Sequence, residues 1–173
     1  MSILTKGTLV RRDLSMLADV NQRVNVDIAM SIAVFDDQLQ QQVEPGTPRT
    51  SARLETLRQA VSMGFDATVF LMPVLPYLTD SRPHLEHAIA LIAETGVKRV
   101  RHGVLHLRQG AREWFIRWLA KEHPDLVGPY PQLYGGSPYA SPEYRHALGS
   151  RIASILGRYG LAAVDDEDQP EAR

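Results

Sequence analysis

Apolar residues gather along the chain in four short runs rich in β-branched side chains, a pattern typical of buried β-strands. The runs are Ile3–Thr5, Val26–Val34, Ala67–Val74 and Arg99–Leu107. The second and third runs are almost continuously apolar, as expected for strands that are covered on both faces. Because segments with helical spacing separate the runs, the pattern predicts an α/β fold of parallel βα units.

The intervening segments also contain residues that typically begin or end helices. Asp13 is placed to cap the first predicted helix, and Ser51 begins the second, which Gly64 follows. The third predicted helix begins after Ser81 and stops at Gly96. No element precedes the first predicted strand, so that strand is expected to be an exposed edge of the sheet.

A fourth helix is predicted from apolar residues at positions 111, 114, 115, 118 and 119, which share one face. Trp114 and Trp118 belong to this stripe. We therefore expect both tryptophans in the core rather than in a ligand platform.

The composition changes after residue 123 and divides the chain into three regions. Residues 1–123 hold the βα units. Residues 124–164 begin with a stretch rich in proline, glycine and tyrosine, predicted as an extended loop up to residue 142, and continue with a last helix over about 142–159. Residues 165–173 form an acidic tail that is predicted to be disordered.

The composition of the 173 residues limits the chemistry of this chain. It contains no cysteine, which excludes disulfides, thiolate nucleophiles and metal or iron–sulfur sites held by its own cysteines. No run of about 18 apolar residues is present, and the first residues lack the apolar core of a signal peptide. We therefore expect a cytoplasmic protein without a membrane partner.

The net charge of −1 hides an uneven distribution. Residues 98–164 contain 10 basic and 4 acidic side chains, whereas residues 165–173 contain 1 basic and 5 acidic side chains. The basic segment is compatible with binding to phosphate or another anion, including nucleic acid. Basic side chains also cover solvated helix faces routinely, and the sequence leaves both interpretations open.

Functional residues of parallel βα units gather at the C-terminal ends of the strands. Lys6 ends the first predicted strand, Ser31 lies near the end of the second, and Arg53 stands in the first turn of a helix. A cation at a helix N-terminus is unfavourable unless an anion is bound, so Arg53 indicates a nearby anion. A surface role for Lys6 and a backbone-satisfied role for Ser31 are the alternatives.

His102 and His106 fall on the last predicted strand and are expected to share one face. Four residues at ~3.3 Å each separate them by ~13 Å, which is too far for both to bind one metal ion. The sequence contains no HExxH, P-loop, GxGxxG or GxSxG pattern. No metal site is predicted, and the residues alone identify no catalytic group.

Several short segments, taken in order, resemble the C-terminal part of radical S-adenosylmethionine (SAM) proteins. The group they resemble is the spore-photoproduct-lyase-like one, also described as Rv2578c-type or DNA repair photolyase-like. The segments are residues 3–6, 24–32, 44–48 with 52–54, 72–80, 105–115 with 118–119 and 123–124, Tyr134-Gly135 and Tyr139-Ala140. In sum, the resemblance extends over most of residues 2–160.

The resemblance implies the C-terminal part of a partial TIM-type (β/α)6 barrel, plus C-terminal helices, with the four predicted strands as strands three to six. It also implies SAM and a [4Fe–4S] cluster, the latter held by a CxxxCxxC loop after the first barrel strand. In that group SAM yields a 5′-deoxyadenosyl radical that abstracts hydrogen from the substrate. By the same resemblance, Lys6 and Ser31 contact SAM and Arg53 binds the SAM carboxylate.

The chain departs from this pattern because it contains no CxxxCxxC loop. We therefore expect a truncated or split form that is inactive alone and needs another chain for the missing N-terminal barrel half. One alternative is a non-enzymatic nucleic-acid-binding or interaction module that uses the basic segment. Another is a cofactor-free half-barrel lyase or isomerase, which the lack of a visible acid/base pair disfavours.

Overall fold

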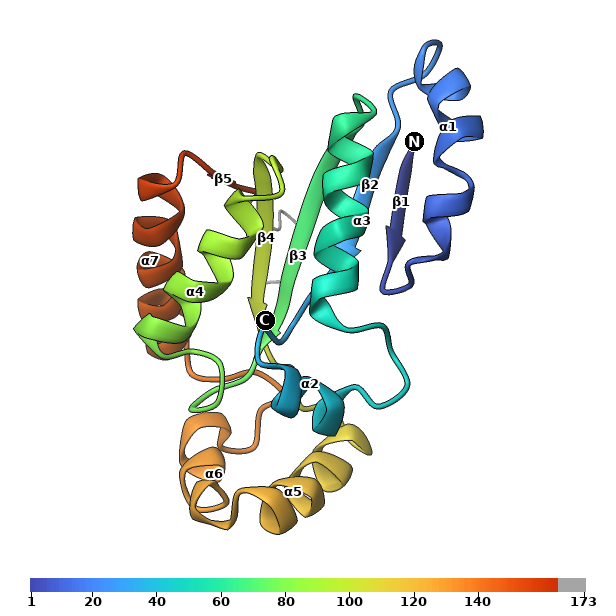
Figure 1. Ribbon diagram of the computed structural model, residues 1–173. Helices are drawn as coiled ribbons and strands as arrows, with labels where there is room; N and C mark the ends of the chain where they lie inside the picture. The colour runs from blue at the N-terminus through green and yellow to red at the C-terminus, as the bar shows by residue number, and fades with distance from the viewer. Residues whose placement is uncertain (165–173) are drawn as a thin grey trace.

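The computed structural model describes residues 1–164, which form one parallel sheet with helices packed on it. The strands are β1 (Ser2–Thr5), β2 (Asp27–Ser31), β3 (Asp66–Val74), β4 (Arg99–Val104) and β5 (Ala162–Ala163). They lie side by side in chain order, with β1 at one edge (Figure 1), and every neighbouring pair is parallel. The α/β fold of parallel βα units that the pattern predicts is confirmed.

The strand register separates two faces of the sheet. Ser31 pairs with Phe70, and Phe70 pairs with Arg101, so these three side chains share one face. The opposite face is covered by α3 (Thr50–Ser62) and α4 (Arg82–Ala93), which lie in front of the sheet in Figure 1. The main apolar core therefore lies between the sheet and these helices.

The ends of α3 and α4 follow the signals in the sequence. The Ser81 hydroxyl caps α4 by accepting a hydrogen bond from the backbone N–H of His84 at 3.3 Å. Gly64 follows α3 with a φ of 85°, a left-handed conformation that glycine adopts without a clash of a Cβ atom. Leu57 of α3 and Ile89 of α4 are fully buried in the shared core.

The first helix, α1 (Leu14–Asn21), begins differently from the prediction. Asp13 occupies its N-cap position, but the Asp13 side chain forms no capping hydrogen bond. Instead, the 3-10 turn η1 (Leu9–Arg12) leads directly into the helix. Leu14 and Leu17 anchor α1 in a smaller apolar cluster over the first two strands.

Two short α-helices and a 3-10 helix between residues 37 and 134 were not predicted. α2 (Asp37–Val43) follows Asp36, whose side chain caps it by accepting a hydrogen bond from a backbone N–H at 2.7 Å. In the stretch 124–142, η2 (Pro124–Leu126) and α6 (Pro129–Tyr134) take the place of the extended loop, so that prediction is wrong for these residues. Proline favours loops but also suits the first turn of a helix, where its missing N–H needs no partner.

α5 (Ala111–Glu122) covers the fourth predicted helix, but part of its apolar stripe faces solvent. Phe115 and Leu119 are buried, whereas 54% of the Trp114 surface is exposed. The prediction that both tryptophans lie in the core is therefore wrong for Trp114. Trp118 packs beside Phe115, with the ring centroids 5.4 Å apart.

The last helix, α7 (Pro142–Arg158), packs against α4, and β5 then extends the sheet beyond β4. The pattern did not predict β5, which has only two residues. Among residues 1–164, no helix has the length and apolar character needed to cross a membrane. The predicted acidic tail, residues 165–173, lies outside the described residues.

Candidate functional site

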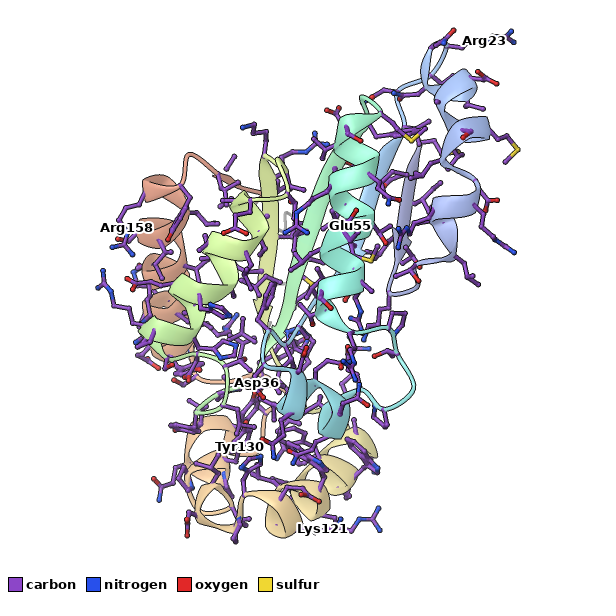
Figure 2. All side chains as sticks on the ribbon, in the orientation of Figure 1. Arg23, Asp36, Glu55, Lys121, Tyr130 and Arg158 are labelled. Carbon is purple, nitrogen blue, oxygen red and sulfur yellow. The ribbon has the colours of Figure 1, made fainter. Side chains whose placement is uncertain are left out.

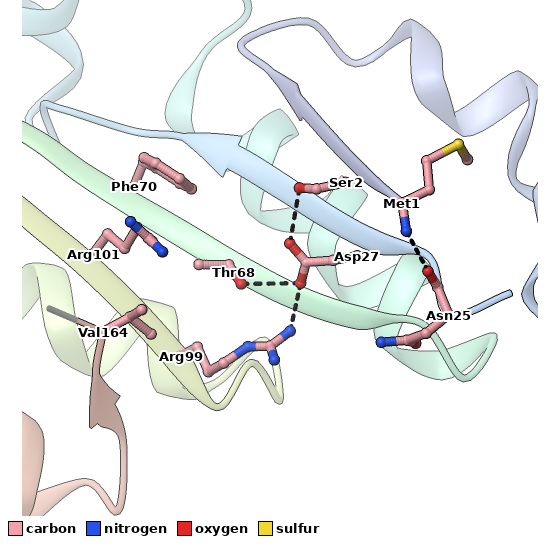
Figure 3. A pocket seen from close by; sticks show the side chains of 9 residues that line it. All are labelled: Met1, Ser2, Asn25, Asp27, Thr68, Phe70, Arg99, Arg101 and Val164. Carbon is pink, nitrogen blue, oxygen red and sulfur yellow. Dashed lines mark hydrogen bonds and ion pairs between the residues drawn. The ribbon is translucent and has the colours of Figure 1, made fainter. Parts of the chain in front are cut away.

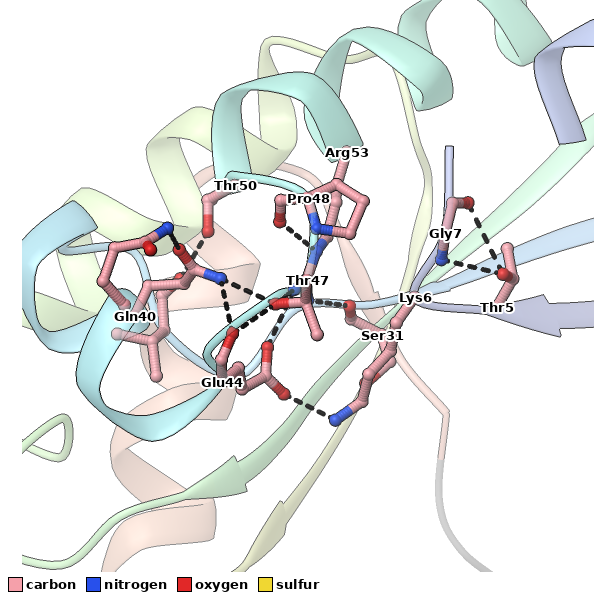
Figure 4. A network of polar contacts seen from close by, with 12 residues as sticks. Thr5, Lys6, Gly7, Ser31, Gln40, Glu44, Thr47, Pro48, Thr50 and Arg53 are labelled. Carbon is pink, nitrogen blue, oxygen red and sulfur yellow. Dashed lines mark hydrogen bonds and ion pairs between the residues drawn. The ribbon is translucent and has the colours of Figure 1, made fainter. Parts of the chain in front are cut away.

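A polar cluster centred on Glu44 joins the C-terminal ends of β1 and β2 to the start of α3 (Figure 4). Lys6 follows β1, Ser31 ends β2, and Arg53 stands in the first turn of α3. The structure thus brings together all three residues that the sequence singled out. It adds Glu44, which the sequence analysis did not identify as a functional residue.

Arg53 is completely buried, and each of its three guanidinium nitrogens donates to an oxygen of the chain. Nε donates to the Pro48 carbonyl and Nη1 to the Ser31 carbonyl, both at 2.9 Å. Nη2 donates to Oε2 of Glu44 at 2.8 Å and to Oγ1 of Thr47 at 2.6 Å. The anion that the position of Arg53 indicates is therefore present within the chain, as Glu44.

Glu44 connects this buried arginine to a more accessible cation. Its Oε1 accepts a hydrogen bond from Nζ of Lys6 at 2.5 Å, and 9% of the Glu44 side chain is exposed, against 49% for Lys6. Burial raises the pKa of Glu44, but the hydrogen bonds and positive charges of Lys6 and Arg53 outweigh burial and lower it overall. Glu44 is therefore an ionised carboxylate at neutral pH, with Lys6 on its solvent side.

Thr47 and Gln40 fix the loop that carries Glu44. The fully buried Gln40 donates from Nε2 to the Thr47 hydroxyl at 2.8 Å, and Arg53 donates to the same oxygen. The Thr47 hydroxyl in turn donates to the Glu44 carbonyl at 2.8 Å. This hydroxyl uses its one donor and two acceptor positions, which ties the loop to α2 and α3.

Ser31 enters the cluster through its backbone carbonyl. Its hydroxyl forms no hydrogen bond with any residue between 1 and 164. The register places the Ser31 side chain on the sheet face that α3 and α4 leave uncovered, beside Phe70. A hydroxyl in this position is available to a bound molecule.

A second polar contact lies at the end of β3, where Tyr144 of α7 donates to Oδ2 of Asp80 at 2.6 Å. Burial raises the pKa of Tyr144, and the hydrogen bond to Asp80 raises it further. Arg151 donates from Nη1 to the Asp80 backbone carbonyl, also at 2.6 Å. Both contacts tie α7 to the loop after β3, so we interpret this contact as structural.

The uncovered face of the sheet also carries a cavity of about 470 Å³ near the N-terminal ends of the strands (Figure 3). Asp27 stands at its centre and accepts hydrogen bonds from Ser2 at 3.2 Å and Thr68 at 3.0 Å. Arg99 pairs with the same carboxylate, with Nη2 2.5 Å from Oδ1. One carboxylate thus links residues from β1, β2, β3 and β4, at the opposite end of the strands from Glu44.

The predicted pairing of His102 and His106 on one strand is wrong, because β4 ends at Val104. The His106 ring instead packs against Tyr139, with ring centroids 4.6 Å apart. Over residues 1–164, no three His, Cys, Asp or Glu side chains are placed to hold a metal ion. With no cysteine in the sequence, a thiolate-held [4Fe–4S] cluster does not fit the residues of this chain.

Several arginines of the basic segment serve internal contacts. Arg112 donates to the backbone carbonyls of Leu107, Gly135 and Ser137. Arg158, on the outer side of α7 (Figure 2), pairs with Glu86, with Nη2 2.5 Å from Oε1. Much of the positive charge that suggested nucleic-acid binding is thus neutralised or hydrogen-bonded within the fold, and the alternative of a nucleic-acid-binding module stays a prediction.

Comparison with known proteins places the chain among relatives of undescribed activity. Rv2578c of Mycobacterium tuberculosis (strain H37Rv) is 45% identical over 171 residues, which are 99% of this chain and 50% of the relative. ORF301 of Acidianus two-tailed virus is 32% identical over 162 residues, covering 92% of this chain and 48% of the relative. Both are called uncharacterized, and no family model matches the chain.

Solved structures share the fold. A spore photoproduct lyase mutant with bound AdoMet and dinucleoside spore photoproduct matches with a TM-score of 0.68 and 14% identity, over 94% of this chain and 49% of that chain. Another spore photoproduct lyase complex with the same dinucleoside matches at 0.66 and 15% identity, over 94% of this chain and 49% of that one. The chain is thus similar in sequence to half of Rv2578c and shares part of its fold with spore photoproduct lyase. It spans about half the length of the curated relatives it matches.

The resemblance predicted from the sequence is therefore confirmed as a similarity to Rv2578c, and the fold matches part of the spore photoproduct lyase fold. The Glu44 cluster lies at the C-terminal strand ends, where parallel βα folds place their functional residues. The connection between β2 and α3 supplies Glu44 and Thr47. In the sequence, the signal for this connection is the run of polar residues that directly precedes the helix of Arg53.

Proposed function

We propose that this chain forms the SAM-binding side of a lyase-like radical SAM enzyme. The observation that carries the proposal is the ionised Lys6–Glu44–Arg53 cluster at the C-terminal strand ends. It occurs in a fold shared with a spore photoproduct lyase structure that contains bound AdoMet. SAM carries a carboxylate, an ammonium group and ribose hydroxyls, which such a cluster can bind.

We assign different roles to the three residues. The Lys6 ammonium group is accessible and suits the SAM carboxylate, and the unused Ser31 hydroxyl suits a ribose hydroxyl. The resemblance assigns the SAM carboxylate to Arg53, but this guanidinium is buried and occupied by the chain's own oxygens. Arg53 is therefore proposed as a positioning residue, which holds Glu44 and through it Lys6.

When bound and reduced, SAM would supply the radical chemistry of this enzyme group. The residues of this chain fit SAM but not the cluster that reduces it, because the sequence has no cysteine. We propose that cysteines outside this sequence hold the [4Fe–4S] cluster and that the chain is inactive by itself. The chain's own contribution would be to bind and orient SAM at the strand ends.

The test is SAM binding by isothermal titration calorimetry to the purified chain and to Lys6→Ala and Ser31→Ala variants. Loss of the charge-assisted hydrogen bond from Lys6 should weaken the Kd for SAM about tenfold, or ~1.4 kcal/mol. Ser31→Ala should weaken it less, because a neutral hydrogen bond is lost. Lys121→Ala is the matched control, since Lys121 is exposed on α5, away from the cluster, and pairs with its neighbour Glu122.

Equal SAM affinity in Lys6→Ala and the unaltered chain would overturn the assignment of Lys6. No measurable SAM binding by the unaltered chain would overturn the proposed function itself.

A further inference from the structure

Tyr77, in the turn after β3, has an unusual backbone conformation. Its φ is 64°, and no other non-glycine residue between 1 and 164 has a positive φ. A Cβ atom in this left-handed region clashes with the backbone, so glycine usually occupies it, and asparagine does so less often. Tyrosine is therefore an unfavourable residue here. Strained residues of this kind gather at functional sites, where the surrounding structure holds them in place.

Hydrogen bonds that do not involve the Tyr77 side chain hold this turn. The backbone N–H of Thr79 donates to the Leu75 carbonyl at 2.9 Å, and the Thr79 hydroxyl accepts from the backbone N–H of Leu75 at 2.8 Å. From α6, the Tyr130 hydroxyl donates to the Pro76 carbonyl, also at 2.8 Å. The turn is thus fixed on both sides of Tyr77, which keeps its backbone in the strained conformation.

The Tyr77 ring is exposed although the turn around it is buried. Leu75, Pro76 and Thr79 are buried, whereas 46% of the Tyr77 surface is exposed. One edge contact orients the ring, because its centroid lies 5.8 Å from that of Tyr130, with 66° between the two planes. The Tyr77 hydroxyl forms no hydrogen bond with any residue between 1 and 164. The remaining surface of the ring is therefore accessible to another molecule.

Tyr77 is the exposed end of a row of aromatic rings. Tyr130 and Tyr134 are buried and stacked, with centroids 5.8 Å apart and 4° between their planes. Both belong to α6, which lies beyond the C-terminal ends of the strands in Figure 1. Aromatic rings prefer edge-to-face or offset contacts with other rings, at centroid distances of about 4.5–7 Å. The free surface of Tyr77 can extend this row by one more ring.

The position of Tyr77 separates it from the residues proposed for SAM. Ser31 pairs with Phe70 of β3, and β3 continues for four more residues to Val74. At ~3.3 Å per residue, the turn that carries Tyr77 begins ~13 Å beyond the level of Ser31. A molecule at the Tyr77 ring therefore lies farther along the strand direction than a ribose held by Ser31. This order suits a substrate that binds on the outer side of SAM.

We propose that Tyr77 is a specificity-determining residue, which selects substrates with an aromatic or other planar ring by contact with its own ring. This inference rests on the proposed function, since it takes the inner part of the strand-end site to be occupied by SAM. The contact with Tyr130 orients the Tyr77 ring before the substrate arrives, which reduces the entropy lost on binding. The strained backbone conformation is what presents the ring at the end of the row.

The experiment measures the Kd of the full chain, saturated with SAM, for benzamide by ligand-observed NMR. Cyclohexanecarboxamide is the matched probe, because it keeps the amide group but has a saturated, puckered ring. Benzamide should bind about fivefold more tightly. Tyr77→Asn should abolish this preference, since asparagine tolerates the left-handed conformation but has no aromatic ring. Tyr77→Phe should keep it.

Two further variants control for the fold and for nonspecific contact. Tyr77→Gly is a second variant without the ring, and it removes the backbone strain as well. Tyr159→Asn should keep the preference for benzamide, since Tyr159 is 43% exposed but lies at the end of α7. Circular dichroism at the assay temperature shows whether each variant is folded.

Each outcome decides the inference. Absence of benzamide binding, equal affinity for the two probes, or an unchanged preference in the folded Asn or Gly variant overturns it. A loss of SAM affinity in these variants also overturns it, because Tyr77 would then contact SAM. If the unaltered chain binds no SAM but still prefers benzamide through Tyr77, the proposed function fails and the ring-binding site stands.

Discussion

Glu44 is the residue whose ionisation holds the candidate site together. Burial raises its pKa, but Lys6 and Arg53 lower it by more, to below the ordinary value of 4.5. A carboxyl group whose pKa is lowered by folding stabilises the folded chain above its unfolded pKa. This contribution is lost as the pH falls through the folded pKa. We therefore expect Glu44 to make stability depend on pH in the range below 4.5.

The substitution Glu44→Gln tests this dependence. At about pH 7 the variant should be less stable than the unaltered chain by about 1–3 kcal/mol, because the buried Arg53 loses its carboxylate partner. As the pH falls below 4.5, the difference should shrink, since Glu44 itself becomes neutral. Urea unfolding over this range measures it, with the exposed Glu94→Gln as control. A difference that stays constant with pH would contradict the expectation.

At the scale of residues, the sequence predicted that Arg53 contacts an anion, but it did not predict which residue supplies that anion. An arginine in the first turn of a helix needs an anion, and the structure supplies one. That the anion is Glu44 depends on how the connection from α2 folds back over Arg53, which Gln40 and Thr47 fix. Such contacts between side chains have no periodic trace in a sequence.

At the scale of elements, the contact between Tyr144 and Asp80 joins α7 to the loop after β3. Tyr144→Phe removes a hydrogen bond to a carboxylate and leaves Asp80 without its donor. We expect a loss of about 2 kcal/mol in the free energy of unfolding, measured by urea denaturation. Tyr159→Phe, at the exposed end of the same helix, should change it by less than about 0.5 kcal/mol. Equal effects of the two substitutions would show that the contact contributes little.

The helices that the sequence predicted are those with enough length to show a helical period. Strands β2 and β3 are apolar runs, and α3 and α4 each repeat their apolar face over about three turns. In contrast, α2 and α6 have seven and six residues, too few for a helical period to emerge. Trp114 was wrongly predicted in the core because only Phe115 and Leu119 of the α5 stripe are buried. Which residues of an apolar stripe become buried depends on the elements packed around the helix.

At the scale of the whole molecule, the fold contains the Lys6–Glu44–Arg53 cluster, for which we propose SAM binding, but the sequence has no cysteine thiolate. We expect that iron and sulfide added anaerobically to the purified chain produce no stable [4Fe–4S] absorbance, because such clusters are held by cysteine ligands. The same treatment of full-length Rv2578c is the matched comparison, since half of that protein aligns with this chain at 45% identity.

The outcome of this reconstitution decides whether cluster binding and SAM binding belong to different halves of the protein. A cluster on Rv2578c and none on this chain would support a division of labour, with reduction on one half and SAM orientation at Lys6 on the other. A stable cluster on this chain would contradict it, because the cluster would then be held by nitrogen or oxygen ligands. In that case the Lys6, Glu44 and Arg53 side chains would belong to a metal-binding site rather than to a site for SAM.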